Sequence, residues 1–134
     1  MTVDIYRHEG LGYNPLLLTP NWQAAILNWD PSCDRANLNK IERHNHTDEV
    51  FVLLRGKSVL FSRQEDEALH AYDLEPGVIY NVPKRVWHGL VADKEASFLI
   101  VEDLNTHLHD TEVRQISTEE LAQLDSQLPA WVLR

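Results

Sequence analysis

One stretch of the sequence, residues 40–56, places several possible metal ligands immediately before an apolar run that ends on a glycine. Glu42, His44 and His46 occupy alternate positions, so all three side chains share a face if the segment is an extended strand. Glu49 then opens the apolar run, which predicts a second, largely buried strand. The pattern therefore predicts a group of ligands attached to a β-sheet, and this strongly limits the folds that the chain can adopt.

A second segment, residues 77–88 with the sequence GVIYNVPKRVWH, adds one more histidine. Its first half predicts a strand, Pro83 starts a turn, and the return strand carries His88. Strand alternation turns the neighbouring Trp87 away from the side on which His88 lies, so we expect Trp87 to pack on the outer face or at a subunit contact.

The rest of the chain predicts an all-β fold. Turn residues separate short segments rich in β-branched and aromatic residues, which together give seven to nine strands and a sandwich or barrel. Residues 4–20 mix glycine, proline and a short leucine run, which predicts an irregular N-terminal arm with at most one short strand and a possible place on a neighbouring subunit. The further strands are expected at 22–29, 49–54, 58–62, 68–73, 97–102 and 112–116.

A short helix is expected near the C-terminus. Ser117 and Glu120 have the spacing of a capping box before apolar residues, which predicts a helix over about residues 118–126 that ends before Pro129. The 134 residues fit one domain, with its core at about residues 22–116.

The two segments resemble the cupin family, whose motifs are Gly(x5)His-x-His(x3–4)Glu(x6)Gly and Gly(x5)Pro-x-Gly-x-x-His(x3)Asn. The spacing from Glu49 to Gly56 and the spacing from Gly77 through Pro83 to His88 match these motifs without a gap. The resemblance implies a predominantly antiparallel cupin-type β-barrel, also called a double-stranded β-helix or jelly roll, and a homodimer. The chain departs from the motifs at the leading glycine (Leu38 or Ala36), at the turn glycine (Arg85) and at the asparagine (Ala92).

The resemblance also implies a metal site, with one ligand left open. His44, Glu49 and His88 are ligands in either of two alignments of the first motif. The pair His44 and His46 leaves one residue too few before Glu49, whereas the pair Glu42 and His44 has the allowed spacing but places a glutamate first. We favour His46, with Glu42 as the alternative, because imidazole suits more of the metals in question, which are Fe, Mn, Ni, Zn and Cu.

Three other residues are candidates for the wall of a substrate pocket. Phe51 has the same strand parity as Glu49 and should point inward, and Tyr80 lies on the predicted strand of the second segment. Arg85 lies in the turn before His88, where it could contact an anionic substrate or face solvent. His107 and His109 lie in a polar stretch without a partner motif, and we expect a solvated loop there.

Composition excludes some partners. The formal net charge of −9 argues against nucleic acid and anionic membranes, since both attract basic surfaces. The longest apolar run is too short to span a bilayer, and the first residues lack a signal-peptide pattern, so a cytoplasmic protein is expected. Cys33 is the single cysteine and predicts an ordinary free thiol.

By resemblance, the expected function is that of a small metal-dependent enzyme. It would act on a compact polar metabolite, such as a sugar acid or related oxyanion, by isomerase, lyase or oxygenase chemistry. The alternative is a non-catalytic cupin module that binds a small ligand or a metal without turnover. The sequence indicates no catalytic residue beyond the metal ligands.

Overall fold

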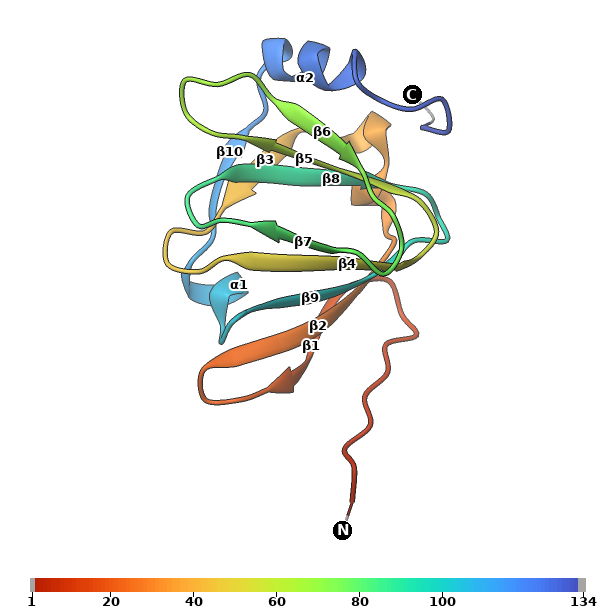
Figure 1. Cartoon of the computed structure of the whole chain (residues 1–134), viewed down its shortest axis with the longest axis vertical. Coiled ribbons are helices and arrows are strands. Elements are labelled where there is room, and N and C mark those ends of the chain that lie inside the picture. Colours follow the sequence, from red (N-terminus) through yellow and green to blue (C-terminus); the bar gives the residue numbers. More distant parts are fainter. Residues whose placement is uncertain (1, 133–134) are drawn as a thin grey trace.

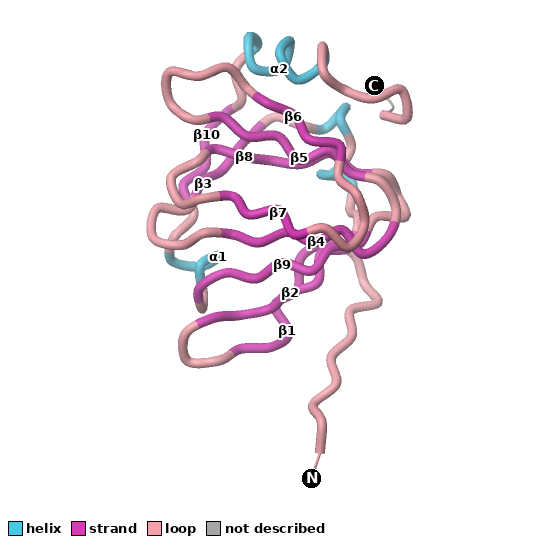
Figure 2. The backbone as a smooth tube through the Cα atoms, in the orientation of Figure 1, coloured by secondary structure: helices cyan, strands magenta, loops and turns pink. Residues whose placement is uncertain are grey.

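The computed structural model describes residues 2–132, and it is an all-β fold of two facing sheets (Figures 1 and 2). All strand pairs are antiparallel. One sheet has the order β1-β2-β9-β4-β7 and the other β10-β3-β8-β5-β6. This confirms the expected jelly roll, built as two stacked sheets. The strands are β1 Gly12–Leu18, β2 Trp22–Asn28, β3 Lys40–Arg43, β4 Glu49–Arg55, β5 Ser58–Arg63, β6 His70–Asp73, β7 Ile79–Val82, β8 Trp87–Ala92, β9 Ser97–Asp103 and β10 Glu112–Gln115.

The N-terminal arm is irregular up to residue 11 and extends away from the body of the protein in Figure 1. The strand β1 follows it at the edge of the first sheet. Pro15 lies within β1, and the register with β2 shifts between Pro15 and Leu17. An edge strand tolerates proline because one side of its backbone has no strand to bond.

Strand alternation divides the apolar residues between two clusters. In β5, Leu60 points into the space between the sheets, whereas Val59 and Phe61 point to the outer face of the second sheet. In β8, Trp87 belongs to the outer cluster, which confirms that it faces away from His88. The guanidinium groups of Arg43 and Arg114 lie 4.6 and 4.7 Å from the centre of a Trp87 ring.

The helix α2, Thr118–Asp125, covers this outer cluster and lies above the second sheet in Figure 1. The expected capping box is present: the Glu120 amide donates to Ser117 Oγ, and the Ser117 amide donates to Glu120 Oε1. Three shorter helical segments were not predicted. They are the 3-10 helices Pro31–Cys33 and Arg35–Asn37 and the helix α1, Thr106–His109.

The backbone requires a glycine at Gly56, the last residue of the first motif. Gly56 has a φ of +76°, and a Cβ atom there would lie 2.5 Å from the backbone nitrogen of Ala96. Only glycine fits both conditions, since other residues are strained at positive φ. No helix in the described part of the chain has the length and apolar character needed to cross a bilayer.

Candidate metal centre

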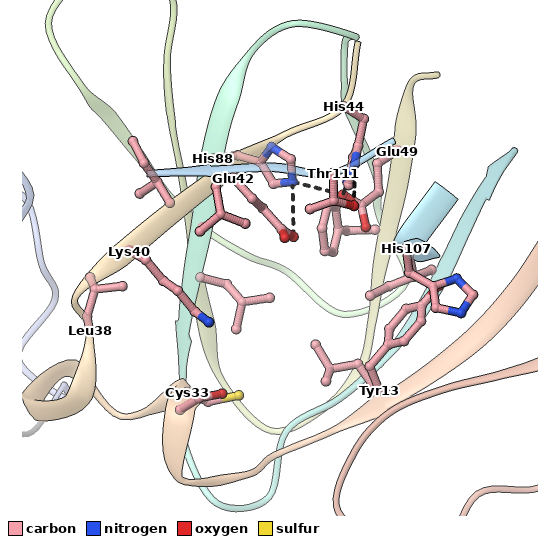
Figure 3. A pocket seen from close by; sticks show the side chains of 18 of the residues that line it. Tyr13, Cys33, Leu38, Lys40, Glu42, His44, Glu49, His88, His107 and Thr111 are labelled. Carbon is pink, nitrogen blue, oxygen red and sulfur yellow. Dashed lines mark hydrogen bonds and ion pairs between the residues drawn. The ribbon is translucent and has the colours of Figure 1, made fainter. Parts of the chain in front are cut away.

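Four side chains converge between the two sheets, as Figure 3 shows. Glu42 comes from β3, His44 directly follows β3, Glu49 begins β4, and His88 lies in β8. One ligand atom from each of the four can be chosen so that all lie within 4.8 Å of one another. Three of these residues are ligands in both alignments of the sequence motif, and Glu42 was the alternative for the fourth.

Glu49 is the centre of the group. Its Oε1 atom lies 2.9 Å from Nε2 of His44 and 2.8 Å from Nε2 of His88. Oε1 of Glu42 lies 3.9 Å from Nε2 of His88. His44, Glu49 and His88 are all buried, whereas 43% of the Glu42 side chain is exposed.

Backbone carbonyl groups fix the orientation of both imidazole rings. Nδ1 of His44 lies 2.7 Å from the carbonyl oxygen of Asp110, and Nδ1 of His88 lies 3.0 Å from that of Val86. A carbonyl oxygen only accepts, so each Nδ1 carries a proton and each Nε2 points into the site. Histidine ligands of metals are commonly held in this way.

The same contacts test whether a metal fits. With Nδ1 protonated, each histidine can donate to Glu49 from Nε2 only if it is doubly protonated. With both imidazoles doubly protonated, two positive charges surround one buried carboxylate, and a divalent cation would supply the same charge. Two imidazole nitrogens and two carboxylates form a suitable donor set for first-row transition metals.

The pKa shifts follow from these contacts. Burial alone would lower the pKa of His44, but its hydrogen bond and ion pair with Glu49 raise that pKa to about 9. Burial would also lower the pKa of His88, but its hydrogen bond and ion pair with Glu49 outweigh burial and raise that pKa. Burial would raise the pKa of Glu49, but the two histidines outweigh it and lower that pKa to about 2. The walls of the cavity desolvate Glu42, and together with the charge of Glu49 they raise its pKa.

His46, the favoured fourth ligand, lies outside the group. Its shared face with His44 required the strand to continue through residue 46, but β3 ends at Arg43 and the chain bends at residues 45–46. Asp110 holds this bend, because its carboxylate accepts hydrogen bonds of 2.9 Å from the amides of both Asn45 and His46. The side chain of His46 is consequently exposed, and the geometry favours Glu42 instead.

The group of four lies in a cavity of about 380 Å³. Phe51 lines it, as its parity predicted, and its ring meets the His88 ring edge-on at 6.0 Å. Tyr80 and Arg85 are not part of the lining. The Tyr80 hydroxyl accepts from the Glu75 amide at 3.0 Å, and the Arg85 side chain is exposed.

Arg85 departs from the motif in residue type but adopts a backbone conformation that favours glycine. Its φ is +70°, the conformation for which the family uses glycine at this turn. Its amide donates to the carbonyl oxygen of His44 at 2.6 Å, so the turn before His88 is tied to the loop that carries His44.

Sequence reasoning missed a second polar group in the cavity wall. Glu102 lies in β9, where it has the same parity as the buried residues Phe98 and Ile100. A glutamate at an inward position of an apolar strand was the signal that could have identified it. Tyr13 and His107 also line the cavity. The expected loop is the short helix α1, but His107 and His109 are both exposed to solvent, as expected. His107 also contributes to the cavity wall, and its Nδ1 lies 3.0 Å from Gln23 Nε2.

No family model matches the chain, and no curated protein matches it by sequence. Solved structures do match. A cupin-like protein from Thermotoga maritima is 19% identical, with a TM-score of 0.54 over 90% of this chain and 96% of that one. A variant of Streptomyces PAC13 with uridine is 11% identical, with a TM-score of 0.57 over 89% and 96%. Fe(II)-HppE with an alternative substrate is 20% identical, with a TM-score of 0.50 over 69% and 48%. These similarities show that the chain has the cupin fold.

Proposed function

We propose that this protein is a metal-dependent enzyme of the cupin fold that acts on a compact polar metabolite. Glu42, His44, Glu49 and His88 would hold one divalent ion of Fe, Mn, Ni, Zn or Cu. The observation that carries the proposal is the convergence of two carbonyl-oriented imidazoles on one buried carboxylate. The Fe(II) of the structurally similar HppE is consistent with such a site in this fold.

A bound ion would polarise a substrate oxygen or lower the pKa of a water molecule, which suits isomerase, lyase or oxygenase chemistry. The chain's own residues contribute the surroundings. Phe51 packs edge-on against the buried His88 ring, and Glu42 is the partly exposed member of the group of four. Glu102, outside the group of four, supplies an oxygen 3.7 Å from Nε2 of His44.

The assignment of Glu42 as the fourth ligand can be tested against His46 directly. The metal content of purified, untagged protein would be compared with that of the variants Glu42→Ala and His46→Ala. We expect Glu42→Ala to bind the metal more weakly by about tenfold or more, and His46→Ala to match the unaltered protein, since His46 is outside the group. Weaker metal binding by His46→Ala than by Glu42→Ala would instead favour the alignment in which His46 is the fourth ligand.

Turnover is the property that separates an enzyme from a binding module. Metal-dependent conversion of a small metabolite, lost in His88→Ala, would support the enzyme. Retention of metal and ligand without conversion of any bound compound would assign the protein to the non-catalytic class.

A homodimer is part of the proposal. The N-terminal arm carries Val3, Ile5 and Tyr6 with exposures of 83%, 74% and 48%. Apolar side chains on an extended arm are stabilised when they pack on a neighbouring subunit. The mass in solution at micromolar concentration tests this, and a monomer would contradict it.

A further inference from the structure

A connected group of polar side chains lines the cavity beside the four ligands. Tyr13 of β1, Glu102 of β9 and His107 of α1 are in the cavity wall, and Figure 3 shows Tyr13 and His107 next to each other. The fully buried Gln23 of β2 is joined to them by hydrogen bonds. The Tyr13 hydroxyl donates to Oε1 of Glu102 at 2.7 Å. Gln23 Nε2 donates to the Tyr13 oxygen at 2.9 Å. These bonds fix the orientation of the Glu102 carboxyl group.

The other oxygen of Glu102 lacks a partner. Among residues 2–132, Oε2 of Glu102 is the buried side-chain polar atom that accepts and donates no hydrogen bond. The Glu102 side chain is 2% exposed, and this oxygen lies 3.7 Å from Nε2 of His44. His44 does not satisfy it, because the distance is too long and its Nε2 is directed at Glu49. A buried polar atom without a partner is costly, and a bound molecule can supply that partner.

A hydroxyl group suits this position better than other polar groups. A hydroxyl both donates and accepts, so it pairs with Oε2 whether Glu102 is ionised or not. A ligand carboxylate offers only acceptors and would bring a further negative charge close to Glu102. An ammonium group offers only donors, so it pairs with just one of the two forms of Glu102.

The charges of the cavity lead to the same choice. Asp30, Glu42, Glu49 and Glu102 line it, against the single cation Lys40 among the described lining residues. If Glu42 and Glu49 balance a divalent ion, Asp30 offsets Lys40, and Glu102 leaves one excess negative charge when it is ionised; burial raises the pKa of Glu102 to about 7. Like charges at close range disfavour binding, so an anionic ligand is at a disadvantage here.

We propose that this cavity binds a neutral, polyhydroxylated compound of monosaccharide size, one hydroxyl of which bonds to Oε2 of Glu102. The inference rests on the proposed function, because it names the substrate class of the same site. The sequence suggested Arg85 as a partner for an anionic substrate, but the Arg85 side chain is exposed and does not line the cavity. The inference therefore makes the proposed substrate neutral instead of anionic. Glu102 then acts in recognition, and Tyr13 and Gln23 position it.

The test uses matched pairs of neutral sugars and their acids, namely D-glucose with D-glucuronate, D-galactose with D-galacturonate, and D-xylose with D-xylonate. Binding to the metal-loaded protein is measured by calorimetry, with metal content determined on the same samples. We expect at least one neutral sugar to bind, and to bind about tenfold or more tightly than its acid. Tighter binding of the acids, or no binding by any neutral sugar, would overturn the proposal.

The variant Glu102→Gln keeps the shape and an oxygen for Tyr13 but places an amide nitrogen where Oε2 lies. We expect it to weaken sugar binding by about tenfold or more, as the loss of a buried hydrogen bond does. Glu95→Gln, the same change at an exposed turn, is the matched control and should bind like the unaltered protein. Equal binding by Glu102→Gln would refute the role of Glu102.

Two further measurements keep the result interpretable. If Glu102→Gln fails to fold, Tyr13→Phe removes the hydroxyl that orients Glu102 and should give a smaller loss of binding; unchanged binding would count against the proposal.

Metal content separates the substrate-class inference from the proposed function on which it rests. Protein that holds metal but binds no neutral sugar would overturn only the substrate class, whereas protein without metal would overturn the proposed function.

Discussion

The metal-free protein should lose stability as the pH rises above neutrality, because contact with Glu49 raises the pKa of two buried histidines more than any other partner does. The folded-state pKa of His44 is raised from 6.5 to about 9. A raised folded pKa gives a contribution that is fully present below the unfolded pKa and is lost as the pH rises through the folded pKa. The pKa of Glu49 is lowered from 4.5 to about 2, so its contribution is present above pH 4.5 and is lost as the pH falls through about 2.

The magnitude follows from the shift of His44. A change of one pKa unit corresponds to about 1.4 kcal/mol, so His44 alone contributes about 3 kcal/mol at about pH 6 that is nearly gone at about pH 9.5. Little correction for solvent screening is needed, because only 5% of the His44 side chain is exposed. His88 adds to this loss in the same direction. The free energy of unfolding of the metal-free protein should therefore be greatest between about pH 4.5 and 6.5.

The assay is urea unfolding of metal-stripped protein at about pH 6 and about pH 9.5. The variant Glu49→Gln is the control, since without the carboxylate neither histidine has a reason to stay protonated and the loss should shrink by most of its size. A bound divalent ion replaces the same protons, so the metal-loaded protein should not show the loss. Equal stability of the metal-free protein at both pH values, or an undiminished loss in Glu49→Gln, would refute the reasoning.

Three substitutions test other parts of the structure by urea unfolding. Glu120→Gln should cost about 3 kcal/mol, because the carboxylate is 1% exposed and accepts from two arginines as well as from the helix cap; a loss under about 1 kcal/mol would contradict this. Gly89→Ala should cost about 1–3 kcal/mol, because its Cβ would lie 2.5 Å from Cζ of the buried Phe61; a neutral effect would mean that Phe61 moves freely. Arg85→Gly should stabilise the protein by up to about 1 kcal/mol by removing a side chain at positive φ, and a loss of stability would reveal a contact of Arg85 that outweighs this strain.

Most of the strands could be predicted from the sequence because alternation and turn residues are local signals. The strand over Ser97–Asp103 and the helix capped by Ser117 both fall within two residues of their expected limits. The strand β1 was less clear, since it contains a proline and is stabilised at the edge of the sheet by pairing with β2. The helix α1 has only four residues and follows Asn105 at a φ of +60°, so little in its sequence distinguishes it from a loop.

The ligand group was predictable in part. His44, Glu49 and His88 have the spacing of two motifs, and that spacing reflects the strands that carry them. The choice between Glu42 and His46 depended on where β3 ends, which is decided by hydrogen bonds to Asp110, a residue far along the chain. Strand parity could not supply this information, because it holds only while the strand continues.

Glu102 shows how a buried polar residue can be passed over. Its strand reads as apolar, so the glutamate at its end resembles the beginning of a solvated turn. Its partners Tyr13 and Gln23 come from the first two strands, and only the sheet order β1-β2-β9 brings them next to it.

The metal content of untagged protein, measured by elemental analysis beside the variants His44→Ala and His88→Ala, tests the central claim most directly. The account predicts about one divalent transition metal ion per chain in the unaltered protein and a loss of that ion in both variants. No metal in the unaltered protein, even after incubation with Fe, Mn, Ni, Zn and Cu, would contradict the account, as would full metal content in either variant.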